Sequence, residues 1–159
     1  MVGFAGLDVP AELRSLAREF DLGGVILFAR NVDAPEQVAE LVHGLRRLGG
    51  EQPPWIAIDQ EGGRVARLRK PFTEWPPMAT LGRSGDVHLT ARFARALAEE
   101  LRLVGISLDF APVLDVHTNP ANPVIGDRAL SDRAERVAEH GRAIIDALQA
   151  AGVAACGKH

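Results

Sequence analysis

The sequence predicts an α/β fold in which about four βα units place parallel strands side by side in one sheet. Two observations lead to this prediction: short apolar runs alternate with segments of helical periodicity, and the links between them differ in length with direction. Such alternation is typical of a parallel sheet with right-handed crossovers. Because the chain has 159 residues, 47% of them apolar, we expect one folded unit that spans residues 1–159.

The first unit is expected near the start of the chain. A helix is predicted from about Pro10 to Phe20, because its apolar residues recur on one face. A glycine pair at 23–24 then leads into residues 25–28 (VILF). A continuous apolar run of this kind is typical of a strand that is buried on both faces.

The second unit repeats the pattern. Its helix is expected to begin with a cap at Asp33 and a capping-box acid at Glu36, and to end at the glycine pair 49–50. Residues 55–58 (WIAI) form the second expected strand, and Asp59 follows it directly. An acid is therefore expected where a buried strand opens into a loop.

Two further units complete the prediction. A long helix is indicated by apolar residues at helical spacing over 89–104, and a third strand by residues 108–114. A further helix is expected after Ser131 and through Leu148, and a fourth strand over 152–156. Four strands of this kind are the basis for the parallel sheet.

The links between these elements indicate which face of the fold carries the function. Links from helix to strand are short, as at residues 105–107, whereas the links 60–87 and 117–130 from strand to helix are long. Long loops without structure of their own are usually functional. In barrels the site lies where these loops follow the strands, although link lengths alone do not separate a barrel from other parallel folds.

Composition excludes several classes of function. Eighteen Lys and Arg against twenty-one Asp and Glu give a net charge of −3 without a basic block, so we expect no nucleic-acid partner. Cys156 is the sole cysteine, which excludes an internal disulfide, and we expect it to be a buried small apolar residue. We see no signal peptide, membrane-length apolar run, nucleotide-binding glycine motif or metal-ligand spacing. We therefore expect a cytoplasmic protein with no membrane contact, no cofactor and no metal.

The sharpest motif is Asp59–Leu68 (DQEGGRVARL), which opens at the end of the second strand. A carboxylate there can accept hydrogen bonds from two adjacent hydroxyls of a sugar ring. Arg64 and Arg67 offer forked donors for sugar oxygens or for carboxylates. An Asp–Arg salt bridge that only ties down the loop has equal weight as an alternative.

A second motif covers residues 119–128 (NPANPVIGDR), in which Asn-Pro turns predict a rigid loop. Arg128 stands just before a helix start and is expected to point inward at an anionic or polyhydroxy ligand. Asp127 is expected to brace Arg128 or to cap a turn rather than to act as a base.

A third motif, Gly157–His159, follows the fourth strand. Lys158 and His159 are well placed there to donate hydrogen bonds to a substrate, although a solvated chain end is the alternative.

Other polar and aromatic residues have structural readings. His140 lies near the apolar face of its helix and is expected to be a satisfied core histidine. Asp109 and Asp115 are expected to make buried structural hydrogen bonds. Trp75, in the long second loop, is equally compatible with stacking on a sugar and with packing inside the loop.

Five segments together resemble the bacterial β-N-acetylhexosaminidase branch of glycoside hydrolase family 3. They occur in the family's order across nearly the whole chain, at residues 23–31, 59–65, 108–116, 125–128 and 157–159. Each segment is modest alone, and the five in register are quite specific. The resemblance implies the first half of a TIM-like (β/α)8 barrel.

The resemblance also implies a function and a set of site residues. Family members of this branch hydrolyse terminal β-linked N-acetylglucosamine with retention, in peptidoglycan recycling, so the implied substrate is a muropeptide of the cell wall. The implied contacts to sugar hydroxyls and neighbouring polar groups are Asp59, Arg67, Arg128, Lys158 and His159.

Catalysis needs more than these residues. Retaining hydrolysis requires a carboxylate nucleophile and a general acid, and in this branch both occupy positions after His159. A complete barrel takes ~250 residues, so the chain matches about the first half of a full family member. We therefore expect no catalytic residue within the chain, and neither hydrolysis nor tight sugar binding by the chain alone.

Three other readings stay open. A family 3 β-glucosidase is the alternative within the same class of enzyme. An assembly module, in which a half-barrel self-associates through its exposed sheet edges and binds sugar without cleaving it, is an alternative of a different class. An unrelated parallel α/β binding domain would require all five matches to be coincidence.

Overall fold

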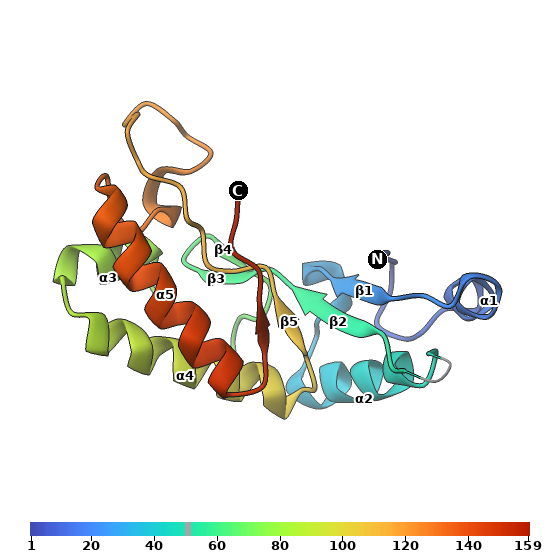
Figure 1. Cartoon of the computed structure of the whole chain (residues 1–159). Coiled ribbons are helices and arrows are strands. Elements are labelled where there is room, and N and C mark those ends of the chain that lie inside the picture. The colour runs from blue at the N-terminus through green and yellow to red at the C-terminus, as the bar shows by residue number, and fades with distance from the viewer. Residues whose placement is uncertain (50–51) are drawn as a thin grey trace.

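The computed structural model of the chain describes residues 1–49 and 52–159, which form a four-stranded sheet with helices packed against it (Figure 1). The strands are all parallel and lie in the order β1, β2, β5, β6. Their bounds are Gly24–Leu27, Trp55–Ile58, Leu108–Asp109 and Ala154–Ala155. This arrangement confirms the predicted α/β class. Within the described residues the sheet is open and does not close into a barrel.

The helices alternate with these strands along the chain. Their bounds are α1 Ala11–Phe20, α2 Pro35–Arg46, α3 Met78–Ser84, α4 Val87–Leu103 and α5 Ala134–Ala150. Shorter elements are the 3-10 turns η1 (Ala29–Asn31) and η2 (Gly126–Arg128) and the antiparallel hairpin of β3 (Gln60–Gly62) and β4 (Val65–Ala66). The four long helices and four parallel strands match the predicted units closely.

Part of the structure lies where the sequence predicted only loop. Residues 60–87 contain the hairpin β3–β4 and the helix α3, whose runs are too short to show a clear apolar period. The sheet also gains a pairing at its β1 edge, where Val2 forms a parallel bridge with Val25. The N–H of Val2 donates to Gly24 O (3.1 Å), and its carbonyl accepts from the N–H of Ile26 (2.9 Å).

The third strand is shorter than the expected residues 108–114. β5 ends at Asp109, where the regular ladder is interrupted because the N–H of Cys156 donates to the carbonyls of both Asp109 (2.9 Å) and Ala111 (3.1 Å). Pairing resumes as an isolated parallel bridge between Val113 and Lys158. The neighbouring strands β5 and β6 therefore stay side by side as far as the predicted site.

The predicted cap of the second helix is wrong. α2 begins at Pro35 with Ala34 in the cap position, and no side chain caps it. Proline is favoured at the first helical position because its missing N–H would have no partner there. The N–H of Asp33 instead donates to Gln37 Oε1 (3.0 Å), and Glu36 does not form the expected capping box.

The end of the second helix also differs from the expectation. α2 ends at Arg46, before the glycine pair, and the N–H of Leu48 donates to Leu45 O in a turn. Gly49 follows this turn, and Gly50 lies outside the described residues.

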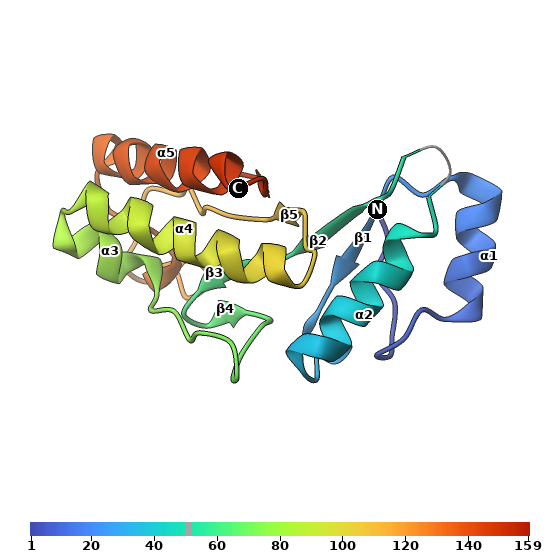
Figure 2. The ribbon, with the colours of Figure 1, turned by 90° about the horizontal axis from the view of Figure 1, so that it is seen from below.

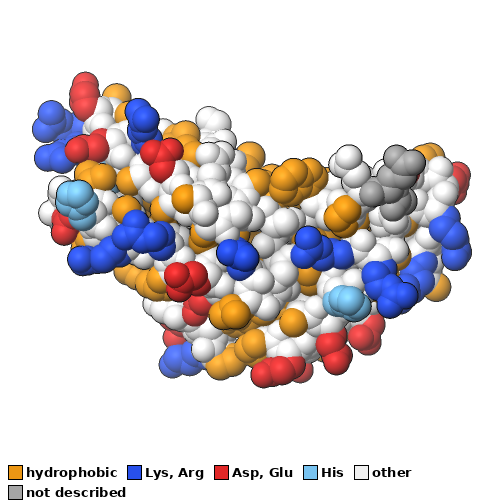
Figure 3. Space-filling model, turned by 60° about the horizontal axis from the view of Figure 1, so that its bottom comes forward, with side chains coloured by type: hydrophobic (Ala, Val, Ile, Leu, Met, Phe, Trp, Pro, Cys, Tyr) orange, Lys and Arg blue, Asp and Glu red, His pale blue; other side chains and the backbone are white. Residues whose placement is uncertain are grey.

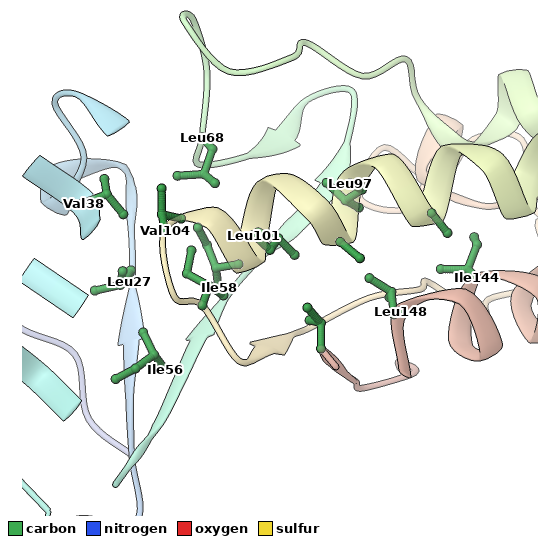
Figure 4. Packing of buried hydrophobic residues seen from close by; sticks show 14 of the residues in the cluster. Leu27, Val38, Ile56, Ile58, Leu68, Leu97, Leu101, Val104, Ile144 and Leu148 are labelled. Carbon is green, nitrogen blue, oxygen red and sulfur yellow. The ribbon is translucent and has the colours of Figure 1, made fainter. Parts of the chain in front are cut away.

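Helices α2, α4 and α5 pack on one face of the sheet, and α4 runs alongside α5 (Figures 1 and 2). Figure 4 shows the core between them, where Ile58 from β2 meets Leu101 from α4, and Leu148 from α5 lies close by. All three side chains are fully buried. Burial of such side chains contributes about 1.5–3 kcal/mol each, so this layer holds the loop ends of the strands in place.

The surface formed by the helices is mixed in character, with neither a purely charged nor a purely apolar face. Figure 3 shows Lys, Arg, Asp and Glu side chains interspersed with apolar ones on that face. In the part of the chain that is described, no helix is long and apolar enough to cross a membrane.

Candidate functional site

The site residues predicted from sequence come together at the carboxyl ends of the strands. Asp59 follows β2, Arg67 follows the hairpin β3–β4, Arg128 ends η2, and Lys158 and His159 follow β6. The carboxyl ends of parallel strands share one edge of a sheet. Side chains that are 99 positions apart in the sequence are therefore in direct contact.

Asp59 lies between two cations. Its Oδ1 accepts from Lys158 Nζ (2.8 Å), and its Oδ2 accepts from Arg67 Nη2 (3.1 Å). Burial alone would raise the pKa of Asp59, but the hydrogen bond and charge of Lys158, joined by those of Arg67, hold that pKa below its ordinary value. The carboxylate stays ionised, and each oxygen keeps a lone pair for a ligand hydroxyl.

Glu61 is a site residue that the sequence reading missed. Its side chain is 1% exposed, and its two oxygens accept from Nη2 and Nε of Arg128, both at 2.9 Å. Oε1 also lies 2.6 Å from Lys158 Nζ. Strand alternation was the available signal, because residues i and i+2 share a face, and Glu61 stands two residues after Asp59.

Arg128 points inward, as expected, but toward protein groups. Besides its two bonds to Glu61, its Nη1 donates to Val124 O (3.0 Å). The hydrogen bonds that Arg128 donates to Glu61 raise the pKa of Arg128 against the opposing effect of burial, and the charge of Glu61 raises it further. Arg128 is thus a permanently charged donor with a fixed orientation.

His159 completes the cluster and corrects the reading of Asp115. His159 Nδ1 lies 2.8 Å from Asp115 Oδ2, and Nε2 lies 3.4 Å from Arg128 Nη2. A guanidinium can only donate, so Nε2 accepts and the ring proton sits on Nδ1, facing Asp115. Asp115 is partly exposed, and it orients His159 rather than making a buried structural bond.

The hairpin that carries Glu61 is shaped by Gln60. Its side-chain oxygen accepts from the N–H groups of Arg67 (2.8 Å) and Leu68 (3.0 Å), and its amide donates to Leu68 O (2.9 Å). The N–H of Gln60 donates to Asp109 Oδ1 (2.9 Å). Asp109 is fully buried, which confirms its predicted structural role.

The loop 119–128 is tied to the hairpin by Arg64. Its Nη2 donates to the carbonyls of Pro123 (3.0 Å), Val124 (2.6 Å) and Ile125 (3.2 Å). Its Nε pairs with Asp127 Oδ1 (3.2 Å). The expectation that Asp127 braces Arg128 is therefore wrong: Asp127 pairs with Arg64, because Arg128 already faces Glu61.

Trp75, His140 and Cys156 lie outside the cluster of predicted site residues. Trp75 meets Phe93 edge-on with 5.1 Å between ring centroids, and its Nε1 donates to Glu100 (3.3 Å), so it packs against α4. His140 is buried in α5, and its Nδ1 bonds to Thr90 Oγ1 (2.8 Å). This confirms a core histidine, but its buried Nε2 has no hydrogen-bond partner among the described residues, so it is not fully satisfied as expected. Cys156 is only partly buried, which corrects its expected full burial.

The cluster of Asp59, Glu61, Arg67, Arg128, Lys158, His159 and Asp115 is referred to below as the strand-end cluster. In this cluster the Asp59 oxygens can accept further hydrogen bonds, and the cations keep N–H groups that can donate. Such a mixture of acceptors and donors suits a neutral polyhydroxy ligand, because each hydroxyl can both donate and accept. Among residues 1–49 and 52–159, no group of three or more His, Cys, Asp or Glu is arranged to hold a metal ion.

Comparison with known proteins gives one consistent match. Residues 3–159 match the glycosyl hydrolase family 3 N-terminal domain. A beta-hexosaminidase of Nitrosomonas eutropha is 45% identical over 147 residues, covering 87% of this chain and 41% of the relative. One of Pseudomonas aeruginosa is 39% identical, covering 100% of this chain and 47% of the relative.

Solved structures agree with these sequence relatives. A family 3 β-N-acetylglucosaminidase of Paenibacillus superposes with a TM-score of 0.95 at 44% identity, covering all of this chain and 31% of that one. NagZ of Neisseria gonorrhoeae in complex with N-trifluoroacetyl-D-glucosamine superposes with a TM-score of 0.92 at 35% identity, covering all of this chain and 48% of that one. The chain spans less than half the length of these relatives.

Proposed function

Since the chain belongs to the glycosyl hydrolase family 3 N-terminal domain family, we propose that it supplies the sugar-binding half of a β-N-acetylhexosaminidase-type glycosidase. The observation that carries this proposal is the strand-end cluster, in which Lys158 and Arg67 hold Asp59 ionised at the carboxyl end of β2. A carboxylate oriented in this way is suited to accept hydrogen bonds from two neighbouring sugar hydroxyls.

The proposed substrate is a terminal β-linked N-acetylglucosamine, carried by a muropeptide during peptidoglycan recycling in the cytoplasm. Two facts support the sugar: the relatives are named beta-hexosaminidases, and the NagZ structure holds an N-acylated glucosamine analogue. The proposed contacts are Asp59, Arg67, Arg128, Lys158 and His159.

We propose that the carboxylates of the strand-end cluster do not themselves cleave the glycosidic bond. Retaining hydrolysis needs a free nucleophile and a proton-bearing acid on opposite sides of that bond. Asp59 and Glu61 are each held by cations, and Asp115 is held by His159. We therefore expect sugar binding by these residues without turnover.

Titration of the chain with N-acetylglucosamine, followed by ligand-observed NMR, tests this proposal. We expect roughly millimolar binding, and weaker binding of glucose, which lacks the N-acetyl group. Asp59→Ala should weaken binding at least about tenfold, because it removes the proposed acceptor of the sugar hydroxyls and leaves Lys158 and Arg67 without the partner that orients them. Asp146→Ala is the matched control, since Asp146 is an exposed carboxylate on α5 that pairs with Arg142.

The outcomes separate the two candidate enzymes. Equal binding of both sugars would favour the β-glucosidase alternative, whereas binding that survives Asp59→Ala would place the sugar elsewhere. Turnover of an aryl β-N-acetylglucosaminide by the purified chain would contradict the proposed division between binding and catalysis.

A second proposal concerns self-association. β6 lies at one edge of the sheet, where Ala154 and Ala155 pair with β5 on one side only. An edge strand can pair with a second copy through its free backbone groups. We propose a dimer of the chain in solution, and a monomeric molar mass by light scattering at high protein concentration would contradict it.

A further inference from the structure

Glu61 is the buried carboxylate on which two partly buried cations of the strand-end cluster, Arg128 and Lys158, converge. It contacts Arg128 through both oxygens and Lys158 through Oε1, and it is almost wholly inaccessible to solvent. We propose that Glu61 is a positioning residue, which presents Lys158 and Arg128 to the sugar without touching it. This inference rests on the proposed sugar-binding function.

A count of donors shows what Glu61 controls. Arg128 has five N–H hydrogens. Two go to Glu61, one to Val124 O and one toward His159 Nε2, so one remains, on Nη1. Lys158 has three, of which Asp59 and Glu61 take two. Glu61 therefore decides which N–H of each cation faces a ligand.

The same contacts extend to His159. The guanidinium nitrogen that donates to Glu61 Oε1, Nη2 of Arg128, also lies 3.4 Å from His159 Nε2. Because Nε2 then accepts, the ring proton of His159 stays on Nδ1, against Asp115. One buried carboxylate thus fixes two cations and, through one of them, the tautomer of a third site residue.

Glu61→Gln is the substitution that isolates this role. The amide has nearly the same shape, but its NH2 group would face a cation, and only its oxygen can accept. Arg128 then loses one of its two bonds and Lys158 loses an ionic partner. Glu74→Gln is the matched control, because Glu74 is an exposed carboxylate that pairs with Arg69 and Lys70 outside the cluster.

The first readout is the NMR signal of the Arg128 Nε–H group, assigned with Arg128→Lys, in the protein without ligand. A two-pronged buried ion pair should protect this proton from exchange with water. We expect exchange to be at least about tenfold faster in Glu61→Gln and unchanged in Glu74→Gln. Rapid exchange already in the unsubstituted chain would overturn the proposal, even if Glu61→Gln fails to fold.

The second readout is the affinity for N-acetylglucosamine, measured beside the melting temperature. We expect Glu61→Gln to weaken binding at least about tenfold in a sample that is still folded. Glu61→Asp keeps the charge and should recover part of the loss. A lower melting temperature with unchanged affinity would show a merely structural residue, and would overturn the proposal.

The two readouts distinguish a failure of the proposed role of Glu61 from a failure of the proposed sugar binding. If the unsubstituted chain binds no N-acetylglucosamine, the proposed function fails, and the Arg128 signal alone then decides the role of Glu61. Faster exchange in Glu61→Gln would still support positioning of Arg128, and unchanged exchange would overturn it.

Discussion

The backbone N–H of Gln60 donates to Asp109 Oδ1 across 2.9 Å, and this bond joins the end of β2 to the end of β5. The other oxygen of Asp109, Oδ2, is buried and has no hydrogen-bond partner in the part of the chain that the structure describes. Burial raises the pKa of Asp109 well above its ordinary value, although the Gln60 N–H and the charge of Lys158 oppose the rise. The pKa of the acid beside the strand-end cluster is therefore held well above that of an exposed aspartate.

Asp109→Asn should stabilise the fold at neutral pH or leave it unchanged. A carboxyl whose folded-state pKa is raised contributes its stability below the unfolded value of 3.8, and this contribution is lost as pH rises toward the folded pKa. Asparagine is neutral throughout and still accepts from Gln60. Urea unfolding between about pH 4 and pH 8 should show the gain of Asp109→Asn over the natural chain growing with pH.

Asp146→Asn is the control. Asp146 is an exposed carboxylate that pairs with Arg142, and its substitution should add no such pH dependence. A loss of several kcal/mol at pH 7 in Asp109→Asn would mean that Lys158 stabilises an ionised Asp109, contrary to our reading.

The fold was predictable where apolar periodicity was strong. Strand β2 has the predicted bounds, Trp55–Ile58, because a continuous apolar run between turn residues fixes them. The bridge at Val2 was missed because a single pair of backbone bonds leaves no periodic pattern. The early end of β5 was missed because the N–H of Cys156, on the neighbouring strand, is shared by the carbonyls of Asp109 and Ala111, and the apolar pattern does not reveal such a shift in register.

The sequence predicted most of the residues of the site, but not which of them contact one another. Asp59 and Lys158 were both expected at strand ends, and they are in contact. Glu61 was missed because a glutamate after a strand is usually exposed, and its burial depends on cations from distant segments. The pairing of Arg64 with Asp127 likewise depends on how two loops meet.

His140→Leu should remove a pH dependence from the stability of the α4–α5 pair. Burial lowers the pKa of His140 below its ordinary value of 6.5, with nearby charges making smaller changes. A histidine of this kind costs stability as pH falls below about 6.5, because only the unfolded chain takes up the proton freely. Leucine cannot be protonated, so unfolding free energies measured from about pH 5 to pH 8 should be flatter.

The loss in His140→Leu at pH 8 should stay below about 2 kcal/mol, because the volume is similar and Nε2 of His140 has no partner to lose. Thr90 Oγ1 keeps its bond to Asp86 O (3.2 Å). His43→Gln, at an exposed position of α2, is the control. If the unfolding free energy of His140→Leu depends on pH as steeply as that of the natural chain, the predicted role of His140 is wrong.

Gly82→Ala should destabilise the fold by about 1–3 kcal/mol or more. A methyl group at Gly82 would overlap the carbonyl oxygen of Leu130 and lie 2.6 Å from its carbonyl carbon. Backbone cannot move aside as a flexible side chain can, so α3 must shift from the loop that carries Arg128. Gly23→Ala is the control, because no atom of the described residues lies within 4 Å of the new methyl group. Thermal unfolding should separate the two variants, and equal melting temperatures would contradict the predicted overlap.

Arg64→Ala should loosen the loop 119–128 while leaving global stability nearly unchanged. Arg64 is about half exposed, so its ion pair with Asp127 contributes little to unfolding free energy. Its bonds to the carbonyls of Pro123, Val124 and Ile125, however, hold this loop against the hairpin β3–β4. Loss of these bonds should lower the local opening free energy.

Hydrogen exchange followed by mass spectrometry is the direct measurement of Arg64→Ala. We expect faster exchange confined to peptides that cover residues 119–128, with helix α5 unaffected. Arg142→Ala, which removes an exposed pair with Asp146, should leave that loop unchanged. Because Arg128 stands at the end of the same loop, faster opening should also weaken N-acetylglucosamine binding severalfold. Loop exchange that matches the unsubstituted chain would show that the turns of the loop, and not Arg64, hold it in place.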